Sequence, residues 1–476
     1  MGSKERFYAD IMAMNPGVTG SCNLVIVRLP NPDYPRIRFT VDCGLFQEKG
    51  DDNYNEDFPF DPDKLDFCLV THNHVDHIGR LPLLVKKGFN NYIYTTESTR
   101  KLLPLSLWDC HKVLKDVAKR KHIKVIYKSE DVSNALSLVK GCEYGKEIQV
   151  HENVYVTFLK NGHLIGAALV FVRITYPGYD DINLLFTGDY KGENVFFNVE
   201  PVPERILELP LTIVQESTYG DMDSEEIHPC FKENILKCIE QGGTVIAPVF
   251  SLGRSQEILY ELRLMQDSGE LNPEIPIYFD GKLAIRYTHL YIASGGRGLD
   301  IKEEMKDFLP KNLTFVDKVT RGEVLNSNTC KIVLTTSGMG SYGPAQAYIS
   351  QYIRRKGALI HFTGYTAEGT LGARLKEAPE NSAVEVAGIV AKKLAKVEYT
   401  TEYSAHAKAD EMIDFLNQFK NLKLVLVNHG EPEVKEQFAD RIVDCVDTKD
   451  VGILGRRYFF RVNPYGLAKT LSTKFE

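Results

Sequence analysis

Short apolar runs separated by glycine and polar turns dominate the first part of the chain. Six of them have the length and the β-branched content that are typical of buried strands. These runs are 22–27, 37–42, 67–71, 154–158, 169–172 and 184–187. The pattern therefore predicts a lobe that is rich in β-strands.

A helical period interrupts these strands over 98–121. Apolar side chains recur there at spacings that predict one dry face and one wet face. The positions expected on the dry face are Leu102, Leu103, Leu107, Val113 and Val117, with Trp108 on the packing face beside them.

Strands and helices alternate in the second half of the chain. Three prolines between 201 and 210 mark an exit from the first lobe. The expected strands at 244–247, 275–279 and 332–334 are interleaved with helices at 256–265 and 345–354, which indicates parallel βαβ units. A further strand at 424–427 follows. A chain of 476 residues also suggests two lobes, with one lobe inserted into the other.

Composition narrows the class of protein. No apolar run approaches the roughly 18 residues that a membrane span needs, so we expect no membrane association. The nine cysteines are scattered and never form a CxxC pair, which argues against a disulfide framework or a thiolate zinc site and favours the cytoplasm. The net charge of −7 argues against a protein that coats nucleic acid by bulk electrostatics.

One short stretch is strongly basic. Either a solvated helix face or an RNA track explains such a cluster, and the sequence favours the solvated face. Its members are Lys115, Lys119, Arg120, Lys121, Lys124 and Lys128.

The densest chemical signal follows directly on the apolar run 67–71. His72, His74, Asp76 and His77 lie within six positions. Imidazole nitrogens and a carboxylate are good ligands for a borderline-soft cation such as zinc, and alternate spacing directs the first two histidines to one side of an extended segment. The alternative is a polar turn whose histidines are simply hydrogen-bonded, but such a turn explains poorly why four ligand-type residues lie within six positions.

This string resembles the HxHxDH metal motif of the metallo-β-lactamase superfamily. His163, in an Asn-Gly-His-Leu segment, matches the downstream histidine of that family, and Asp189, after Thr187-Gly188, matches its bridging carboxylate. Asp42 resembles the family aspartate that hydrogen-bonds to a metal ligand and fixes its tautomer. Alone, each of these residues would be an ordinary turn former.

Further blocks resemble the β-CASP nucleases of this superfamily. Glu216 lies in a match to motif A, His406 in a match to motif B and His429 in a match to motif C, while 247–257, 336–339 and 364–372 match other blocks. The resemblance implies an α/β fold, with a four-layer αββα metallo-β-lactamase core and an inserted α/β β-CASP domain. The expected division is 1–208 for the first part of the core, 209–380 for the insert and 381–476 for the rest of the core.

The resemblance also implies roles for the matched residues. One zinc ion is expected on His72, His74 and His163, a second on Asp76, His77 and His429, and Asp189 is expected to bridge them. Two such ions assist phosphodiester hydrolysis by stabilising the attacking and leaving oxygens. The expected catalytic residues are His406 as the proton donor to the leaving oxygen, its partner Glu216, and Asp76.

Two strand-to-helix loops of the insert are candidates for phosphate contacts. Ser251 and Arg254 lie in one loop, and Ser337 and Gly338 lie in the other. Backbone amides and hydroxyls at a helix N-terminus bind phosphate oxygens, and an arginine adds a bidentate contact. Ordinary strand-to-helix turn chemistry, with an exposed arginine, explains each loop equally well, so both interpretations stay open.

The function expected from the resemblance is zinc-dependent hydrolysis of RNA, since family members that act on RNA resemble this chain in having a histidine at motif C. An endonuclease is favoured, because no extended domain follows the strand at 424–427; a 5′-to-3′ exoribonuclease of the ribonuclease J type is the alternative. RNA is the expected partner, and a homodimer is a possible assembly. A non-catalytic RNA-binding scaffold and a metallohydrolase of a small ester are the readings from other classes.

Overall fold

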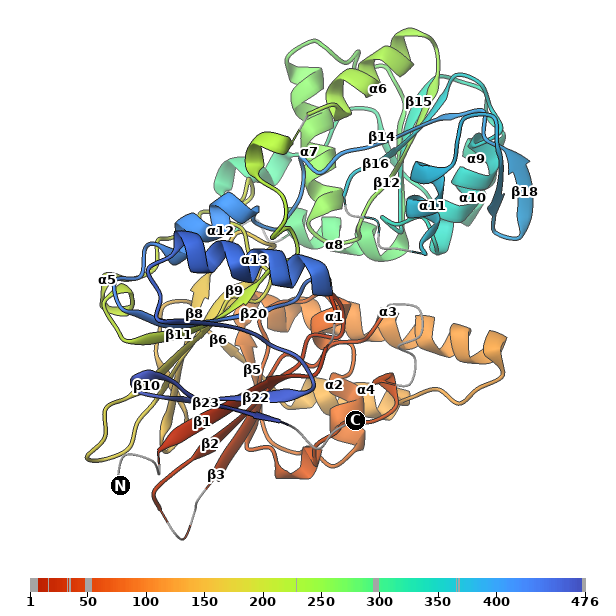
Figure 1. Cartoon of the computed structure of the whole chain (residues 1–476). Helices are drawn as coiled ribbons and strands as arrows, with labels where there is room; N and C mark the ends of the chain where they lie inside the picture. Colours follow the sequence, from red (N-terminus) through yellow and green to blue (C-terminus); the bar gives the residue numbers. More distant parts are fainter. Residues whose placement is uncertain are drawn as a thin grey trace. The chain divides into compact units, whose positions relative to one another are not determined.

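The computed structural model describes residues 7–15, 17–31, 33, 36–47, 54–227, 229–293, 299–364, 366 and 369–472. By its internal contacts the chain divides into two compact units (Figure 1). Unit 1 comprises Met1–Ser224, Gly298–Asp300 and His406–Glu476, and unit 2 comprises Glu225–Arg297 and Ile301–Ala405. The domain borders expected from the sequence, at 208/209 and 380/381, stay a prediction.

The first sheet of unit 1 has eight strands in the order β23-β22-β1-β2-β3-β4-β5-β6. Neighbouring strands from β3 to β6 are parallel, and the other neighbours are antiparallel. The strands are β1 (Tyr8–Ala13), β2 (Asn23–Arg28), β3 (Arg36–Val41), β4 (Phe67–Leu69), β5 (Ile93–Thr96), β6 (Val139–Cys142), β22 (Tyr458–Asn463) and β23 (Gly466–Ser472). The two strands from the end of the chain thus complete the sheet beside β1.

The second sheet of unit 1 has seven strands in the order β21-β20-β11-β10-β9-β8-β7. Its strands β10, β11, β20 and β21 are mutually parallel, whereas β7 to β10 form an antiparallel meander. The bounds are β7 (Ile148–His151), β8 (Val154–Lys160), β9 (Ala168–Ile174), β10 (Ile182–Phe186), β11 (Leu211–Glu216), β20 (Leu422–Asn428) and β21 (Asp450–Ile453).

Helices cover the outer faces of both sheets (Figure 1). They are α1 (Val75–Ile78), α2 (Leu81–Lys86), α3 (Glu97–Lys121), α4 (Ser129–Ser137), α5 (Glu204–Leu207), α12 (Ala409–Leu416) and α13 (Pro432–Cys445). The inner faces of the two sheets bury one apolar layer, which includes Phe39 and Phe158. A second layer lies under α2, α3 and α4, and a third lies under α12 and α13. Helices, first sheet, second sheet and helices thus form four structural layers, which confirms the predicted αββα core.

The exposed half of α3 corrects one expectation. Leu102, Leu103 and Leu107 are buried as predicted, but Val113 is 48% exposed and Trp108 is 39% exposed. The helix is 25 residues long and runs out beyond the sheet in Figure 1, so its later turns have fewer elements to pack against. Periodicity alone identifies the apolar stripe of a helix, but it does not show which turns of the helix other elements pack against.

Unit 2 has a six-stranded sheet in the order β14-β13-β15-β12-β16-β19, in which every neighbouring pair is parallel. This confirms the predicted βαβ alternation. The strands are β12 (Thr244–Pro248), β13 (Ile277–Asp280), β14 (Leu313–Phe315), β15 (Lys331–Thr335), β16 (Ala358–Phe362) and β19 (Lys396–Tyr399), with a hairpin of β17 (Ala383–Val386) and β18 (Ile389–Lys392). The helices are α6 (Phe231–Glu240), α7 (Arg254–Asp267), α8 (Lys282–Ala293), α9 (Lys318–Asn326), α10 (Gly343–Tyr352) and α11 (Leu371–Glu377).

Candidate metal centre

The candidate ligands follow the ends of strands in unit 1. His72 and His74 follow β4, His163 follows β8, Asp189 follows β10 and His429 follows β20. Strands that run in the same direction end at the same edge of a sheet, and in open α/β sheets that edge is where sites form. The end of β4 in the first sheet meets the ends of β8, β10 and β20 in the second, so the packing of the two sheets brings together residues that lie up to 357 positions apart in the sequence.

Two groups of four donors result, and Asp189 also lies within reach of Glu216 and His406. His72, His74, His163 and Asp189 offer ligand atoms that all lie within 4.8 Å of one another. A second group with the same spacing comprises Asp76, His77, Asp189 and His429. Asp189 belongs to both groups, so the structure brings together all seven residues that the sequence proposed as ligands.

The arrangement of the donor atoms suits the binding of cations better than hydrogen bonding among the donors themselves. Nε2 of His163 lies 3.0 Å from Nδ1 of His74, and Nε2 of His77 lies 3.2 Å from Nε2 of His429. At most one nitrogen of each facing pair carries a proton, so lone pairs point into shared space. Nε2 of His72 is buried without a hydrogen-bond partner. An orphaned buried nitrogen is costly unless another group, such as a cation, satisfies it.

The protonation states of His72, His74 and Asp76 agree with this interpretation, whereas the burial of His77 is outweighed by the carboxylates around it, which raise its pKa. Burial lowers the pKa of His74 to about 4 and holds the pKa of His72 well below its ordinary value, so both imidazoles are neutral at pH 7. Burial raises the pKa of Asp76, but His77 and other neighbours outweigh it and lower this pKa to about 2. Neutral imidazole and ionised carboxylate are the forms that bind metal ions.

Asp42 orients one of the candidate ligands. Nδ1 of His77 donates to the Asp42 carboxylate at 2.8 Å, which directs Nε2 towards the other donors. The backbone N–H of Thr71 donates to Asp42 Oδ1 at 2.8 Å, and its hydroxyl donates to Oδ2 at 2.9 Å. Asp42 has a φ of 65°, a conformation that short polar side chains tolerate better than others. A carboxylate held in this way fixes the tautomer of a ligand histidine.

Close backbone packing fixes the loop that carries Asp76. A Cβ atom on Gly44 would lie 1.5 Å from the carbonyl oxygen of Asp76, so only glycine fits there. The backbone N–H of Cys43 donates to the His77 carbonyl at 2.8 Å. The segment after β3 is therefore pressed against α1.

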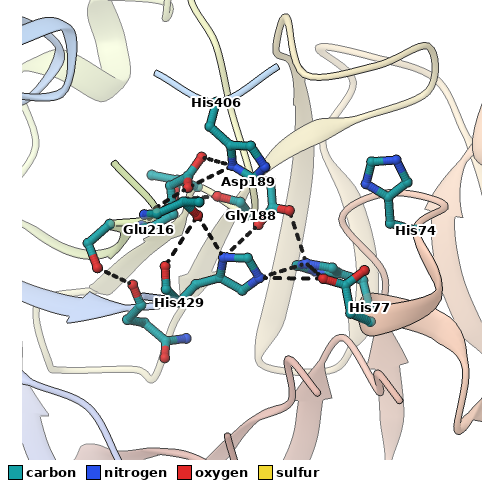
Figure 2. A network of polar contacts seen from close by, with 12 residues as sticks. His74, His77, Gly188, Asp189, Glu216, His406 and His429 are labelled. Atoms are coloured by element: carbon teal, nitrogen blue, oxygen red, sulfur yellow. Dashed lines mark hydrogen bonds and ion pairs between the residues drawn. The ribbon is translucent and has the colours of Figure 1, made fainter. Parts of the chain in front are cut away.

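His406 and Glu216 form a pair beside the donors (Figure 2). Nδ1 of His406 donates to the Glu216 carboxylate, at 3.0 Å from Oε2 and 3.1 Å from Oε1. The backbone N–H of Tyr190 donates to Oε1 at 2.7 Å. Burial alone would lower the pKa of His406, but the Glu216 carboxylate and the nearby Asp189 raise it above its ordinary value. The imidazole therefore tends to keep its proton.

The exposure of the side chains shows which side of the donor cluster faces solvent and which side is buried. The side chains of Asp76 and His406 are 20% and 21% exposed, whereas that of His72 is fully buried. A substrate would therefore meet the cluster on the side of Asp76 and His406.

The candidate phosphate contacts lie in unit 2. Ser251 and Arg254 follow β12, and Ser337 and Gly338 follow the adjacent parallel strand β15, so all four lie at one edge of this sheet. Arg254 is buried, its guanidinium donates to the carbonyl of Thr363, and it pairs with Glu257 at 3.3 Å. The sequence left open an ordinary turn with an exposed arginine, and the burial of Arg254 contradicts that exposure. In the 364–372 block, Tyr365, Ala367 and Glu368 lie outside the described residues.

Sequence reasoning missed the buried guanidinium of Arg80. It donates to the carbonyls of Gly44 (2.5 Å) and Tyr54 (2.8 Å) and stacks between the rings of Phe46 and Phe58. The signal available was an arginine three residues after His77, directly before the apolar α2. Arg80 joins the segment after β3 to the segment that carries the ligands.

Three family profiles match the chain. A metallo-β-lactamase superfamily domain matches residues 33–178, a β-CASP domain matches 255–375, and a domain described as a Zn-dependent metallo-hydrolase RNA specificity domain matches 391–449. Their order along the chain is the one that the motifs predicted.

Curated relatives extend this match over most of the chain. An RNase J-like protein of Methanocaldococcus jannaschii is 30% identical over 436 residues, which are 88% of this chain and 93% of that protein. A ribonuclease of Thermus thermophilus is 30% identical over 425 residues, or 87% of this chain and 91% of that protein. A transcription termination factor of Methanosarcina mazei is 28% identical over 86% of this chain, but only 65% of its own length is covered. The chain therefore belongs to the β-CASP family of the metallo-β-lactamase superfamily and is a metal-dependent hydrolase.

Proposed function

We propose that this protein is a zinc-dependent ribonuclease that hydrolyses RNA phosphodiester bonds at internal positions. One observation carries the proposal: the two donor groups that share Asp189 lie beside the His406–Glu216 pair. A leaving sugar oxygen needs a proton, and this pair lies where it could be supplied. All seven proposed ligand positions hold side chains that can bind metal, which argues against a non-catalytic scaffold.

Zinc fits the donor set best. His72, His74, His163 and Asp189 would hold one ion, and Asp76, His77, His429 and Asp189 would hold the other. Imidazole and carboxylate donors without a thiolate suit a borderline-soft cation that stays at one oxidation state. Two bound ions would supply Lewis-acid stabilisation of the negative charge that develops on the phosphodiester.

His406 is proposed to donate the proton that the leaving 3′ oxygen requires. Its Nδ1 is engaged by Glu216, and Nε2 is the nitrogen proposed to face the substrate. The carboxylate orients the ring and favours the cationic form, which is the form that donates. Asp76 is proposed to act from the exposed side of the cluster, where it meets both the cation and the incoming phosphate.

RNA is the proposed substrate because of the relatives and the profile that the chain matches. Two relatives are named as ribonucleases or RNase J-like, and the profile over 391–449 is described as an RNA specificity domain. Ser251, Ser337 and Gly338 are proposed to contact RNA phosphates at the edge of the sheet in unit 2. Arg254 is proposed to stiffen that edge and to reach a phosphate only if it releases Glu257.

A cytoplasmic protein is proposed on the basis of cysteine chemistry. All nine cysteines are free; six of them lie in unit 1, and five of these six are buried. Among the described residues, none of the helices combines the length and the apolar character that crossing a bilayer requires. A homodimer is kept as a proposal for the assembly.

The test is a cleavage assay on one RNA labelled at either end, with a monophosphate, a triphosphate or a hydroxyl at its 5′ terminus. Internal fragments from all three substrates are expected. Mononucleotides released only from the monophosphate end would instead identify a 5′-to-3′ exonuclease of the ribonuclease J type. The Asp189→Ala variant, which loses the shared donor, is expected to cut none of them.

Two results would contradict the proposal. Undiminished cleavage by Asp189→Ala would separate the activity from the donor cluster. Hydrolysis of a small ester by the zinc-loaded protein, together with failure to cut any of the RNA substrates, would assign the chain to the small-ester hydrolases.

A further inference from the structure

A basic hollow lies at the far end of β2 and β3 from the metal centre. Its volume is about 520 Å³, within the range typical of small-molecule sites. The lining residues are Arg28, Arg36, Arg38, Asp63, Lys64, Leu65, Asp66 and Asn91. Arg36 begins β3 and Asp42 follows its end, so at about 3.3 Å per residue the hollow lies roughly 20 Å from the ligand-orienting carboxylate.

The three arginines share one face of the sheet. Arg28 on β2 is the register partner of Arg36 on β3, and Arg38 is two residues further along the same strand. Ile37 and Phe39 alternate with them and are fully buried in the layer between the two sheets. The guanidinium groups therefore project from the outer face of the sheet, beyond the apolar side chains that the helices cover.

This arrangement is unfavourable for the protein alone. Like charges at directly opposed positions of an antiparallel pair destabilise a sheet. Burial is the largest cause of the lowered pKa of Arg36, and the neighbouring charges of Arg28 and Arg38 lower it further. Within the described part of the chain, no carboxylate forms an ion pair with any of the three guanidinium groups.

The carboxylates that line the hollow have other contacts or are too few to neutralise it. Asp66 accepts the backbone N–H of Arg38 at 2.7 Å, and the only other lining carboxylate in the described residues is Asp63. Lys64 adds a fourth positive charge, although it pairs with Asp61 at the rim. With Lys64 paired to Asp61, three arginines face two lining carboxylates, which leaves the hollow with a net positive charge in a chain whose overall charge is −7.

We propose that this hollow is a phosphate-binding site, separate from the metal centre, in which Arg28, Arg36 and Arg38 hold a multiply charged phosphate group. Arginine presents a planar fork of donors that matches phosphate oxygens in bidentate fashion, and three forks on adjacent register positions converge on one anion. The ligand supplies the negative charge that the protein does not. Two sources carry this chemistry, a free polyphosphate and the backbone of an RNA chain.

Chemical labelling tests the site directly. Phenylglyoxal modifies accessible guanidinium groups, and mass spectrometry reads the modified residue. Tripolyphosphate is expected to protect Arg36 and Arg38 in the metal-loaded protein, and to leave the exposed Arg205 on α5 unprotected. Labelling reports each arginine separately, so anion bound at the metal centre does not contribute, and the result does not depend on RNA cleavage.

Two further anions identify the source. A cleavage-resistant oligoribonucleotide that protects the same arginines would assign the site to the RNA backbone, and protection by tripolyphosphate alone would assign it to a free polyphosphate. Polyglutamate is the third arm. Equal protection by polyglutamate would mean that the hollow responds to negative charge of any kind, and would overturn the assignment to phosphate.

The Arg36→Gln variant gives a second readout, with Arg205→Gln as the matched control for the loss of one exposed positive charge. Without added anion, Arg36→Gln is expected to melt at the same temperature as the wild type or slightly higher, because a repulsion is removed. Its affinity for tripolyphosphate, measured by calorimetry, is expected to fall about tenfold or more, as the loss of a charge-assisted hydrogen bond implies. Background binding at the metal centre is common to all three proteins.

Two outcomes would overturn the proposal. Equal affinities of Arg36→Gln and Arg205→Gln for tripolyphosphate would show that Arg36 does not contact the anion. A lower melting temperature of Arg36→Gln without anion would show that the arginine stabilises the fold itself, so the repulsion argument would fail.

Discussion

His406 and Glu216 belong together at the scale of single residues. The glutamate is almost fully buried, and both of its oxygens lie within 3.1 Å of Nδ1 of the imidazole. Its charge raises the pKa of the histidine against the effect of burial. If His406 donates the proton and Glu216 assists it, as proposed, Glu216 has no role once His406 is removed, so we expect the two losses to be non-additive.

His406→Ala is expected to slow RNA cleavage by about 10² to 10⁴-fold, the usual loss when a general acid is removed. Glu216→Gln keeps the shape of the carboxylate but not its charge, and we expect a smaller loss. The double variant should be no slower than His406→Ala alone. Single-turnover rates and metal content by mass spectrometry check this, and rate losses that multiply would contradict the shared role.

Asp42→Asn tests the orienting contact to His77. Asparagine tolerates the positive φ of this position, so the substitution removes charge and leaves the backbone in place. We expect metal affinity to fall about 10- to 100-fold, as is typical when a partner of a ligand histidine is lost. Competition with a chromophoric chelator measures it. Asp116→Asn, at an exposed position of α3, is the control, and equal affinities of the two variants would refute the role.

At the scale of secondary structure, strands and the residues at their ends were the most predictable features. The apolar runs at 37–42, 67–71 and 424–427 correspond to β3, β4 and β20; β3 is followed by the orienting Asp42, and β4 and β20 are followed by ligand candidates. Chemistry at strand ends is visible in a sequence because an apolar run stops abruptly at polar residues.

Features that depend on which elements pack against one another in the folded chain could not be predicted from the sequence. The strands β22 and β23 complete the first sheet beside β1, more than 400 positions earlier in the chain, and no local pattern indicates that pairing. The exposure of Trp108 and the burial of Arg80 have the same origin. Each depends on which element lies opposite, and a helical or strand period does not contain that information.

His361 on β16 makes the stability of unit 2 depend on pH. The side chain is fully buried, its Nδ1 donates to the carbonyl of Phe362 (3.2 Å), and its Nε2 accepts from Asn234 (3.3 Å), so the neutral ring satisfies both neighbours. Burial lowers its pKa to about 4, from 6.5 in the unfolded chain. Between these values the unfolded state binds the proton and the folded state does not.

We therefore expect His361 to contribute full stability above pH 6.5 and to lose it as the pH falls towards 4. At about 1.4 kcal/mol per pKa unit the loss is roughly 3 kcal/mol. Urea unfolding of the wild type and of His361→Gln at several pH values checks it, because the difference between the two proteins should shrink over this range. A difference that stays constant with pH would contradict the assigned pKa.

At the scale of the whole chain, the candidate site residues are confined to one unit, whereas both units have apolar cores. All nine residues of the donor groups and of the His406–Glu216 pair belong to unit 1, and unit 2 has an apolar core of its own. A ligand stabilises only the conformations that bind it. Metal binding should therefore protect the segments that carry the donors, and the strands of unit 2 should not respond directly.

Hydrogen exchange with and without EDTA tests this distribution. On metal removal we expect faster amide exchange in 71–79, 161–167, 187–190 and 428–431, because buried carboxylates and facing imidazoles lose the charge that holds them together. With metal at about a thousandfold above its Kd the protection factor would fall by up to about 10³-fold. Amides of β12 and β15 should exchange at unchanged rates. Asp189→Ala is the control and should not respond to EDTA; equal acceleration in β12 and β15 would mean that the chelator acts through something other than the donor cluster.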